Sequence, residues 1–296
     1  MSRYRFIAAE KATYPVSLLC RTLDVSRARF YAWRDRGPCR REQTDQQLLE
    51  QITQIHRDAR GTDGAPRVHA ELRAQGVRVG RKRVARLMRT HGLVGCHRRR
   101  RRGLTRRDPA ATPAPDLVGR LFDPGQPDRT WYADISYIPT EEGWLYLATV
   151  LDGYSRKVIG WAMADHLRAE LAVDALQMAL DRRQPAAGLI HHSDRGSQYT
   201  AGVYAQALQA AGLRQSMGQV ATCFDNAVAE SLFATLKTEL VHTRTWPTRQ
   251  AARTAIYEYL EVFYNRRRRH SSLGYLSPTE YERRYHQQHP ATLVAA

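Results

Sequence analysis

The stretch of sequence that decides the fold runs from Thr130 to Met163 and reads TWYADISYIPTEEGWLYLATVLDGYSRKVIGWAM. Three segments in it carry the alternating, β-branched and aromatic pattern that predicts β-strands: residues 130–139, 144–151 and 158–163. The turns between them, at residues 141–143 and 152–153, are short and end in glycine, which favours antiparallel hairpins. The sequence therefore predicts a sheet that begins with three antiparallel strands.

Downstream of this stretch, helical and strand patterns alternate. Apolar spacing predicts helices over residues 169–182, 204–211, 226–240 and 248–265. Short apolar runs predict strands over residues 189–193 and 213–216. Together with the first three strands, this order predicts an α/β fold in which a mixed sheet carries helices on both faces.

Three acidic residues occupy unusual places in these elements. Asp134 lies inside the first strand, where a charge is costly to bury unless something pairs with it. Asp194 directly follows the apolar run at residues 189–193, which is predicted to be a buried strand. Because the carboxyl end of such a strand opens onto a cleft, the Asp194 side chain is expected to line that cleft. Glu230 falls in the first turn of a helix, and Lys237 is on the same face seven residues later. The three acids could converge on divalent cations, although each one alone also fits a turn, a cap or a surface charge.

The excess of basic over acidic residues is confined to the N-terminal part of the chain. Residues 1–120 contain 28 Lys and Arg against 11 Asp and Glu, whereas residues 121–296 contain 18 of each, so the whole net charge of +17 lies before residue 121. Such a field attracts a polyanion, most commonly nucleic acid. A solvated basic surface or a disordered tail is the alternative.

Residues 15–34 fit a helix-turn-helix pattern. Two short apolar helices flank a turn at residues 23–25, and Ser26 can cap the second helix. The residues expected on the inner face of that helix are Phe30, Tyr31 and Trp33. The residues left for DNA are Arg27, Arg29 and Arg34. A small helical hairpin without a ligand remains possible.

Residues 66–92 repeat this pattern more strongly. Val68, Leu72 and Val77 form one apolar stripe, and a second stripe follows Gly80. Gly92 can end the second helix in a left-handed cap. Basic residues crowd the other face of this helix, which makes it a candidate to contact a phosphate backbone: Arg81, Lys82, Arg83, Arg86 and Arg89.

A basic and proline-rich segment follows. Prolines and a run of like charges cannot form a packed core, so residues 97–127 are interpreted as an extended linker that tracks DNA, a solvated tether being the alternative. Its candidate DNA-binding residues are Arg98, Arg99, Arg100, Arg101, Arg102, Arg106 and Arg107. The four cysteines are far apart and show no zinc-ligand spacing, which indicates free thiols. With no apolar run long enough to span a membrane and no signal peptide, a cytoplasmic protein is expected.

Five motifs occur in order along the second half of the chain: WYADISYI, GWLYLATVLDGYSRKVIGW, HHSDRGSQY, CFDNAVAESLFATLK and FYNRRRRHSSLGYLSP. They resemble the integrase-type core of bacterial insertion-sequence transposases, in particular the insertion sequence 3 family. The first 120 residues are similar to the same family's second-reading-frame protein. The resemblance therefore covers nearly the whole chain and implies a ribonuclease-H-like catalytic fold.

This resemblance implies roles for individual residues. Asp134, Asp194 and Glu230 match the catalytic Asp-Asp-Glu residues, and Lys237 matches a basic residue that touches DNA. By the same resemblance, two Mg²⁺ ions, or Mn²⁺ in their place, are held by the three acids for 3′-end cleavage and strand transfer. Ala221 stands where the family usually has Gly, so a backbone that needs positive φ would be strained there.

The resemblance also implies an organisation and partners. The expected segments are a helix-turn-helix at residues 1–42, a second helix-turn-helix-like DNA-binding domain at 43–96, the linker at 97–127, the catalytic domain with its C-terminal helix at 128–285 and a tail at 286–296. The expected partners are duplex DNA at the element's ends and target, a homo-oligomer on that DNA, and an upstream-frame protein that is separate or fused. The expected location is the nucleoid.

Two other classes of function remain open at this point. A non-catalytic DNA-binding regulator of transposition, or an inactive relic, would use the basic N-terminal half alone. A ribonuclease-H-type nuclease would act on RNA–DNA hybrids, although the long basic N-terminal region argues against it. Assays of nicking with Mg²⁺, and of hybrid against duplex cleavage, separate these classes.

Overall fold

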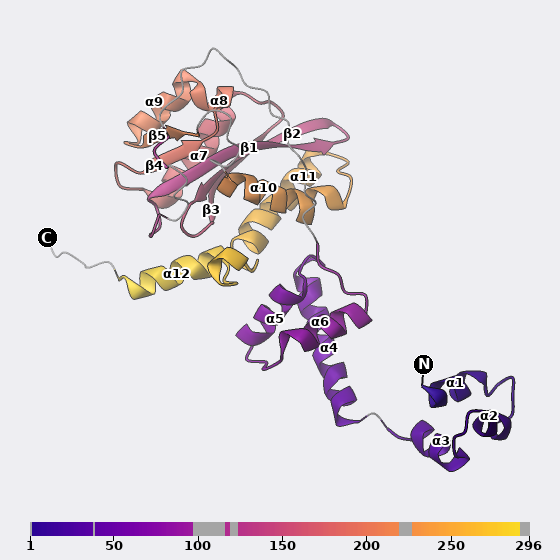
Figure 1. The fold of residues 1–296 in the computed structure, drawn as a ribbon. Coiled ribbons are helices and arrows are strands. Elements are labelled where there is room, and N and C mark those ends of the chain that lie inside the picture. Colours follow the sequence, from indigo (N-terminus) through magenta and orange to yellow (C-terminus); the bar gives the residue numbers. More distant parts are fainter. Residues whose placement is uncertain (1, 38, 97–115, 119–123, 219–226, 291–296) are drawn as a thin grey trace. The chain divides into compact units, whose positions relative to one another are not determined.

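The computed structural model of the chain describes residues 2–37, 39–96, 116–118, 124–218 and 227–290 (Figure 1). The chain divides into two compact units, Met1–Ile52 and Thr53–Ala296. In the part of the chain that the structure describes, no helix combines the length and the apolar character needed to cross a membrane.

The first unit contains three short helices, α1 (Arg3–Glu10), α2 (Val16–Thr22) and α3 (Arg27–Arg34), and the first part of α4 (Arg40–Asp58). Its small core is formed by Ile7 of α1, Leu19 and Cys20 of α2, and Phe30 of α3. The predicted helix pair α2–α3 and its turn are confirmed, with Asp24 at φ 51° in the turn. Helix α1 was not anticipated from the sequence.

Two details predicted for α3 are wrong. Ser26 takes the N-cap position, but its side chain accepts no capping hydrogen bond there. Tyr31 is exposed rather than inward, because it follows the fully buried Phe30 and neighbouring helical residues point about 100° apart. The Arg34 guanidinium lies 4.8 Å from the centre of the Tyr31 ring. The inner face of α3 is therefore made by Phe30 and the partly buried Trp33.

Helices α5 (Ala65–Ala74) and α6 (Arg81–Thr90) belong to the second unit and pack against each other. Their buried residues follow the two predicted stripes: Val68 and Leu72 on α5, and Val84, Leu87 and Met88 on α6. Gly92 has φ 67° just after α6, which confirms the predicted left-handed end.

The sheet has five strands: β1 (Thr130–Thr140), β2 (Gly143–Asp152), β3 (Val158–Ala164), β4 (Ile190–Ser193) and β5 (Arg214–Met217). Their order across the sheet is β3-β2-β1-β4-β5. The pairs β1–β2 and β2–β3 are antiparallel, and the pairs β1–β4 and β4–β5 are parallel. The predicted mixed sheet is confirmed, and β1 lies at its centre.

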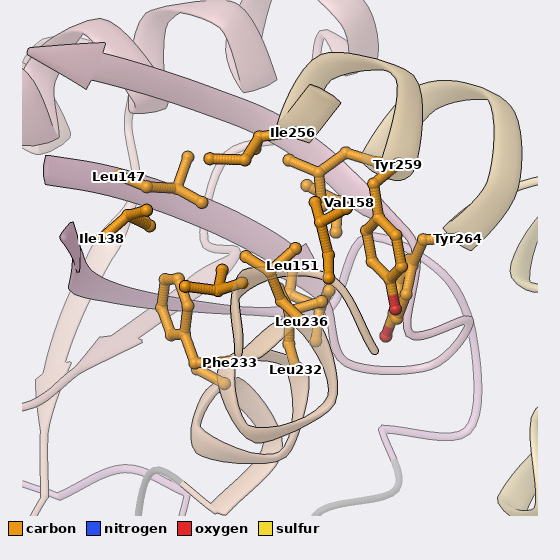
Figure 2. Close-up of a cluster of buried hydrophobic side chains, with 14 of the residues drawn as sticks. Ile138, Leu147, Leu151, Val158, Leu232, Phe233, Leu236, Ile256, Tyr259 and Tyr264 are labelled. Carbon is orange, nitrogen blue, oxygen red and sulfur yellow. The ribbon is translucent and has the colours of Figure 1, made fainter. Parts of the chain in front are cut away.

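Helices cover both faces of the sheet. One face packs against α7 (Ala169–Arg183), α8 (Ser197–Thr200) and α9 (Gly202–Ala210). At Gly160 on β3 an added Cβ would collide with the Ala175 carbonyl oxygen and with Ala179, so glycine is what lets α7 approach so closely. The other face packs against α10 (Ala227–Glu239) and α11 (Arg249–Tyr257). Figure 2 shows this second core, in which Leu232 and Phe233 of α10 belong to the same buried cluster as Ile138 and Leu147 of the strands.

The C-terminal segment is fastened to the sheet by polar contacts. A π-helix, Glu258–Tyr264, continues α11, and after a 3-10 turn at Ser271–Leu273 the chain forms α12 (Pro278–Gln288). The Asn265 side chain accepts a hydrogen bond from the Val158 amide and donates one to the Val158 carbonyl, both at 2.9 Å. Glu282 of α12 pairs with Lys157 at 2.8 Å and with Arg183. These contacts hold the last helices against the edge strand β3.

Candidate active site

Asp134 is the centre of the acidic site. It lies mid-strand on β1, opposite Thr149 of β2, and its carboxylate accepts a hydrogen bond from the Ile135 amide at 2.8 Å. Burial, as the largest cause, and the negative charges of Asp194 and Glu230 together raise the pKa of Asp134 to about 8. The Ile135 amide and the Lys237 ammonium oppose this shift.

Asp194 reaches the site through the parallel pairing of β1 and β4. In that register Ala133 pairs with Ser193, so the next residues, Asp134 and Asp194, leave neighbouring strands that lie about 4.8 Å apart. Asp194 accepts a hydrogen bond from the Gly196 amide at 2.9 Å. Asp194 is exposed to solvent. The surrounding protein nevertheless partly desolvates its carboxyl group, which raises the pKa of that group. The predicted position of Asp194 at the end of a buried strand is confirmed.

Glu230 comes from the helix that crosses this face of the sheet. It lies exposed in the first turn of α10, as predicted, and α10 packs on β1 through Leu232, Phe233 and Leu236. Lys237 is on the same helix, with its ammonium 5.0 Å from the centre of the Tyr137 ring. The negative charge of Glu230 raises the pKa of Asp134, and the positive charge of Lys237 lowers it. The sequence-predicted acids therefore come from a central strand, the end of its parallel neighbour and the helix above them.

The site is open rather than closed around an ion. Among the described residues, no three Asp, Glu, His or Cys side chains lie close enough together to hold one metal ion. The donor chemistry nevertheless suits a hard divalent cation, because the three side chains are carboxylates, and the charges of Asp194 and Glu230 raise the pKa of Asp134. A cation bound there would relieve that repulsion. Ala221 and Cys223, on which the sequence raised expectations, lie outside the described residues.

Three neighbouring residues have structural contacts. Asp152 accepts hydrogen bonds from Ser155 and from the Asp128 amide, so it closes the β2–β3 hairpin, as predicted. His191 contacts the Tyr204 hydroxyl at 3.1 Å, and burial lowers its pKa to about 3, so it is neutral at physiological pH. His192 contacts the Ser216 hydroxyl at 2.9 Å. These contacts pack and orient β4.

Sequence reasoning missed an aromatic pair beside the site. Tyr137 and Trp144 are exposed on β1 and β2 and meet edge to face, with ring centres 4.9 Å apart. Lys237 lies over the Tyr137 ring. The short turn at residues 141–143 would have brought the two aromatic residues close together, so the hairpin pattern was the signal that could have found them.

The candidate DNA-binding residues fall into three groups. In the first unit, Arg27 and Arg29 are exposed on α3. In the second unit, α6 exposes Arg81, Lys82, Arg86 and Arg89 and leaves Arg83 partly buried. The third group lies outside the described residues: Arg98, Arg99, Arg100, Arg101, Arg102, Arg106 and Arg107.

Three family models match most of this chain. The family described as "Integrase core domain" matches residues 124–223, a second family of that description matches residues 230–285, and the family described as "HTH-like domain" matches residues 43–102. Among solved structures, the HTLV-2 integrase catalytic core domain in complex with magnesium is 12% identical, with a TM-score of 0.41, over 53% of this chain and 97% of that one. The BIV integrase catalytic core domain is 18% identical, also with a TM-score of 0.41, over 55% and 99%.

Curated relatives cover almost the whole chain. The "Insertion element IS600 uncharacterized 31 kDa protein" of Shigella sonnei is 41% identical over 269 residues, which are 91% of this chain and 99% of the relative. The "Transposase InsF for insertion sequence IS3A" of Escherichia coli (strain K12) is 39% identical over 282 residues, or 95% and 98%. The chain therefore belongs to the insertion sequence 3 family of DNA transposases, with an integrase-type, ribonuclease-H-like core behind a helix-turn-helix-like region.

Proposed function

We propose that this transposase cleaves the 3′ ends of its insertion sequence and transfers them to target DNA at a site made by Asp134, Asp194 and Glu230. One observation carries the proposal: the pairing of β1 with β4 and the packing of α10 on β1 bring Asp134, Asp194 and Glu230 to the same part of the sheet, where the latter two charges help to raise the pKa of Asp134. Groups with strongly shifted pKa values and charged partners concentrate at functional sites. A non-catalytic regulator gives no reason to maintain such crowding.

The three carboxylates are the proposed ligands of two Mg²⁺ ions. Such ions, when bound, activate the attacking oxygen and offset the charge that develops on the leaving 3′-oxygen. The Ile135 and Gly196 amides orient the Asp134 and Asp194 carboxylates through hydrogen bonds of 2.8 and 2.9 Å. Lys237 supplies a fixed positive charge beside Asp134 and is proposed to bind a DNA phosphate near the reacting one.

The helix-turn-helix-like region is proposed to hold the DNA. The exposed basic residues of α6 and α3 suit phosphate contacts, and the chain's excess charge lies in the same region. We propose that residues 1–96 bind DNA together with the basic linker at residues 97–127, and that catalysis takes place within residues 128–285. A homo-oligomer on nucleoid DNA, joined by an upstream-frame protein or fused to it, completes the proposal.

The test uses two glutamates that occupy comparable positions. Glu230 is exposed in the first turn of α10, and Glu170 is exposed in the first turn of α7. With Mg²⁺ and duplex DNA that carries the element's end, Glu230→Gln is expected to abolish cleavage and joining, whereas Glu170→Gln keeps both activities. If Glu230→Gln cleaves the DNA at the wild-type rate, or if the wild-type chain cleaves an RNA–DNA hybrid in preference to this duplex, the proposed function is wrong.

A further inference from the structure

A second acidic residue of α10 sits in a very different environment. Glu239, the last residue of the helix, is buried. Its carboxylate accepts hydrogen bonds from the Tyr259 hydroxyl at 2.8 Å, from two nitrogens of Arg268 at 2.8 Å each, and from Arg67 at 3.1 Å. The two arginines lower the pKa of Glu239 against the opposing effect of its burial. This carboxylate is therefore held from several sides.

The partners of Glu239 come from distant parts of the chain. Tyr259 and Arg268 belong to the C-terminal segment that follows α11. Arg67 belongs to α5, the helix that packs against the basic helix α6, and the same Arg67 nitrogen also contacts Asp63 at 3.1 Å. Arg67 thus joins the helix-turn-helix-like pair α5–α6 to the end of α10.

Other ion pairs join the same parts of the chain without touching α10. Arg60 contacts Glu258 at 2.6 Å, and Arg269 contacts Glu71 at 2.6 Å. Both pairs link residues near or on α5 to the C-terminal segment. The Arg67–Glu239 contact differs from them because it reaches the helix that also carries Glu230.

Helix α10 provides a direct mechanical link between the two glutamates. Glu230 and Glu239 are nine residues apart, which corresponds to about 13.5 Å along an α-helix. Between them, Leu232, Phe233 and Leu236 are buried against the sheet (Figure 2). A packed helix of this length shifts as one body, so a contact at its last residue constrains the carboxylate in its first turn.

We propose that Arg67 is a positioning residue, which couples the α5–α6 pair to the place of Glu230 in the active site through Glu239 and α10. This inference rests on the proposed catalytic role of Glu230. When α6 binds DNA, the position of α5 is restrained, because the two helices pack against each other. The Arg67–Glu239 contact then restrains the end of α10. Because α10 is packed as one helix, this restraint keeps Glu230 near Asp134. The Arg268 and Tyr259 contacts keep Glu239 satisfied when Arg67 is replaced, whereas the buried Asp63 loses its contact with Arg67.

The kinetic test compares Arg67→Met with Glu258→Gln, which removes the Arg60–Glu258 pair between the same parts of the chain. At saturating DNA we expect Arg67→Met to lower the single-turnover cleavage rate about 10- to 100-fold, the cost typical of a misplaced catalytic group. Its DNA affinity is expected to be unchanged, and Arg67→Lys to recover part of the rate. Glu258→Gln is expected to cleave like the wild type. Equal losses in Arg67→Met and Glu258→Gln, or a wild-type rate in Arg67→Met, would overturn the proposal.

A second test needs no catalysis. Hydrogen exchange of the amides of residues 227–231 follows the first turn of α10 directly, and it is measured on the full chain with and without duplex DNA. We expect DNA to slow this exchange in the wild type and in Arg67→Lys but not in Arg67→Met. The same slowing in all three proteins would refute the coupling. A Glu230→Gln variant that remains active would instead refute the proposed function and would leave the exchange result to decide on the coupling.

Discussion

The two ends of α10 show two ways in which one protein handles acidic side chains. At the first turn, Glu230 is exposed, and together with Asp194 it raises the pKa of Asp134, which is already raised by burial. At the last residue, Glu239 is buried, and two arginines lower its pKa. At the first turn, neighbouring carboxylates disfavour the charged form of Asp134. At the last residue, Arg268 and Arg67 favour the charged form of Glu239.

This difference separates an acid that is part of a structural ion-pair network, Glu239, from the acids that we propose to be catalytic. A buried carboxylate stays ionised when guanidinium groups and a hydroxyl satisfy it, as at Glu239. A carboxylate whose pKa is raised by neighbouring carboxylates is poised to bind a cation from solution, which is the proposed state of Asp134 beside Asp194 and Glu230. The comparison leads to tests in which substitutions at the two ends have opposite consequences.

The largest expected effect is the loss of catalysis in Asp134→Asn. Removing a metal ligand forfeits several kcal/mol of transition-state stabilisation, so cleavage and joining should fall by about 10³-fold or more. Because Asn replaces a carboxyl group whose charged form is disfavoured by burial and by its acidic neighbours, the metal-free melting temperature of the variant should equal or exceed that of the wild type. DNA affinity should be equal or higher, since Asn cannot ionise and adds no negative charge to the site. A cleavage rate near wild type would exclude Asp134 from the site.

At the other end of the helix the expected effect is on stability. Glu239→Ala leaves Arg268, which is also buried, without its partner, and breaking a buried ion pair typically costs about 3–5 kcal/mol in the free energy of unfolding. Denaturant unfolding of the wild type and Glu239→Ala measures the difference. Replacing Glu280, which forms exposed pairs on α12, by Gln is the control and should change stability little. A loss no larger than that of the control would mean that the network does not hold the fold.

The two ends also differ in the pH range over which they affect stability. The folded-state pKa of Asp134, about 8, lies above its ordinary value of 3.8, so the folded protein keeps a proton that the unfolded chain releases between these values. This contribution to stability is complete below the ordinary value and is lost as the pH rises through the folded pKa. The melting temperature of the metal-free protein should therefore fall more steeply between about pH 6 and pH 8 in the wild type than in Asp134→Asn. Parallel curves for the two proteins would contradict the electrostatic description of the site.

The smallest expected effect concerns a single DNA contact on α6. Arg81 is exposed at the first position of α6, and neutralising one phosphate contact changes the slope of log K against log salt by about one. Arg81→Gln should therefore weaken binding modestly and flatten the salt dependence, while the cleavage rate at saturating DNA is maintained. Equilibrium binding at several salt concentrations measures this slope, and an unchanged slope would remove Arg81 from the DNA-binding face.

The elements that position the acids could be predicted from the sequence because their patterns are local. Alternation identified β1, a buried run followed by Asp194 identified the end of β4, and helical spacing placed Glu230 in a first turn. The convergence of these residues depends on the pairing of β1 with β4, which no local pattern specifies. The likeness to a known family supplied that step.

The network around Glu239 could not be predicted, because it depends on long-range packing. Residues 266–269 form a run of four arginines that looks uniform in the sequence. In the structure Arg266 and Arg267 are exposed, whereas Arg268 is buried against Glu239. A π-helix precedes the run, and π-helices are rare enough that the sequence gives no general signal for them.

The most direct test of the central claim is a calorimetric titration of the full chain with Mg²⁺ near neutral pH, carried out in two buffers of different ionisation enthalpy. We expect saturable binding with release of protons by the wild type, because a cation at the site displaces the proton that Asp134 holds at its raised pKa. Asp134→Asn should lose this binding, and Glu170→Gln should keep it. Binding by Asp134→Asn as strong as that of the wild type, or no saturable binding by the wild type with or without DNA, would contradict the assignment of these acids as the metal site.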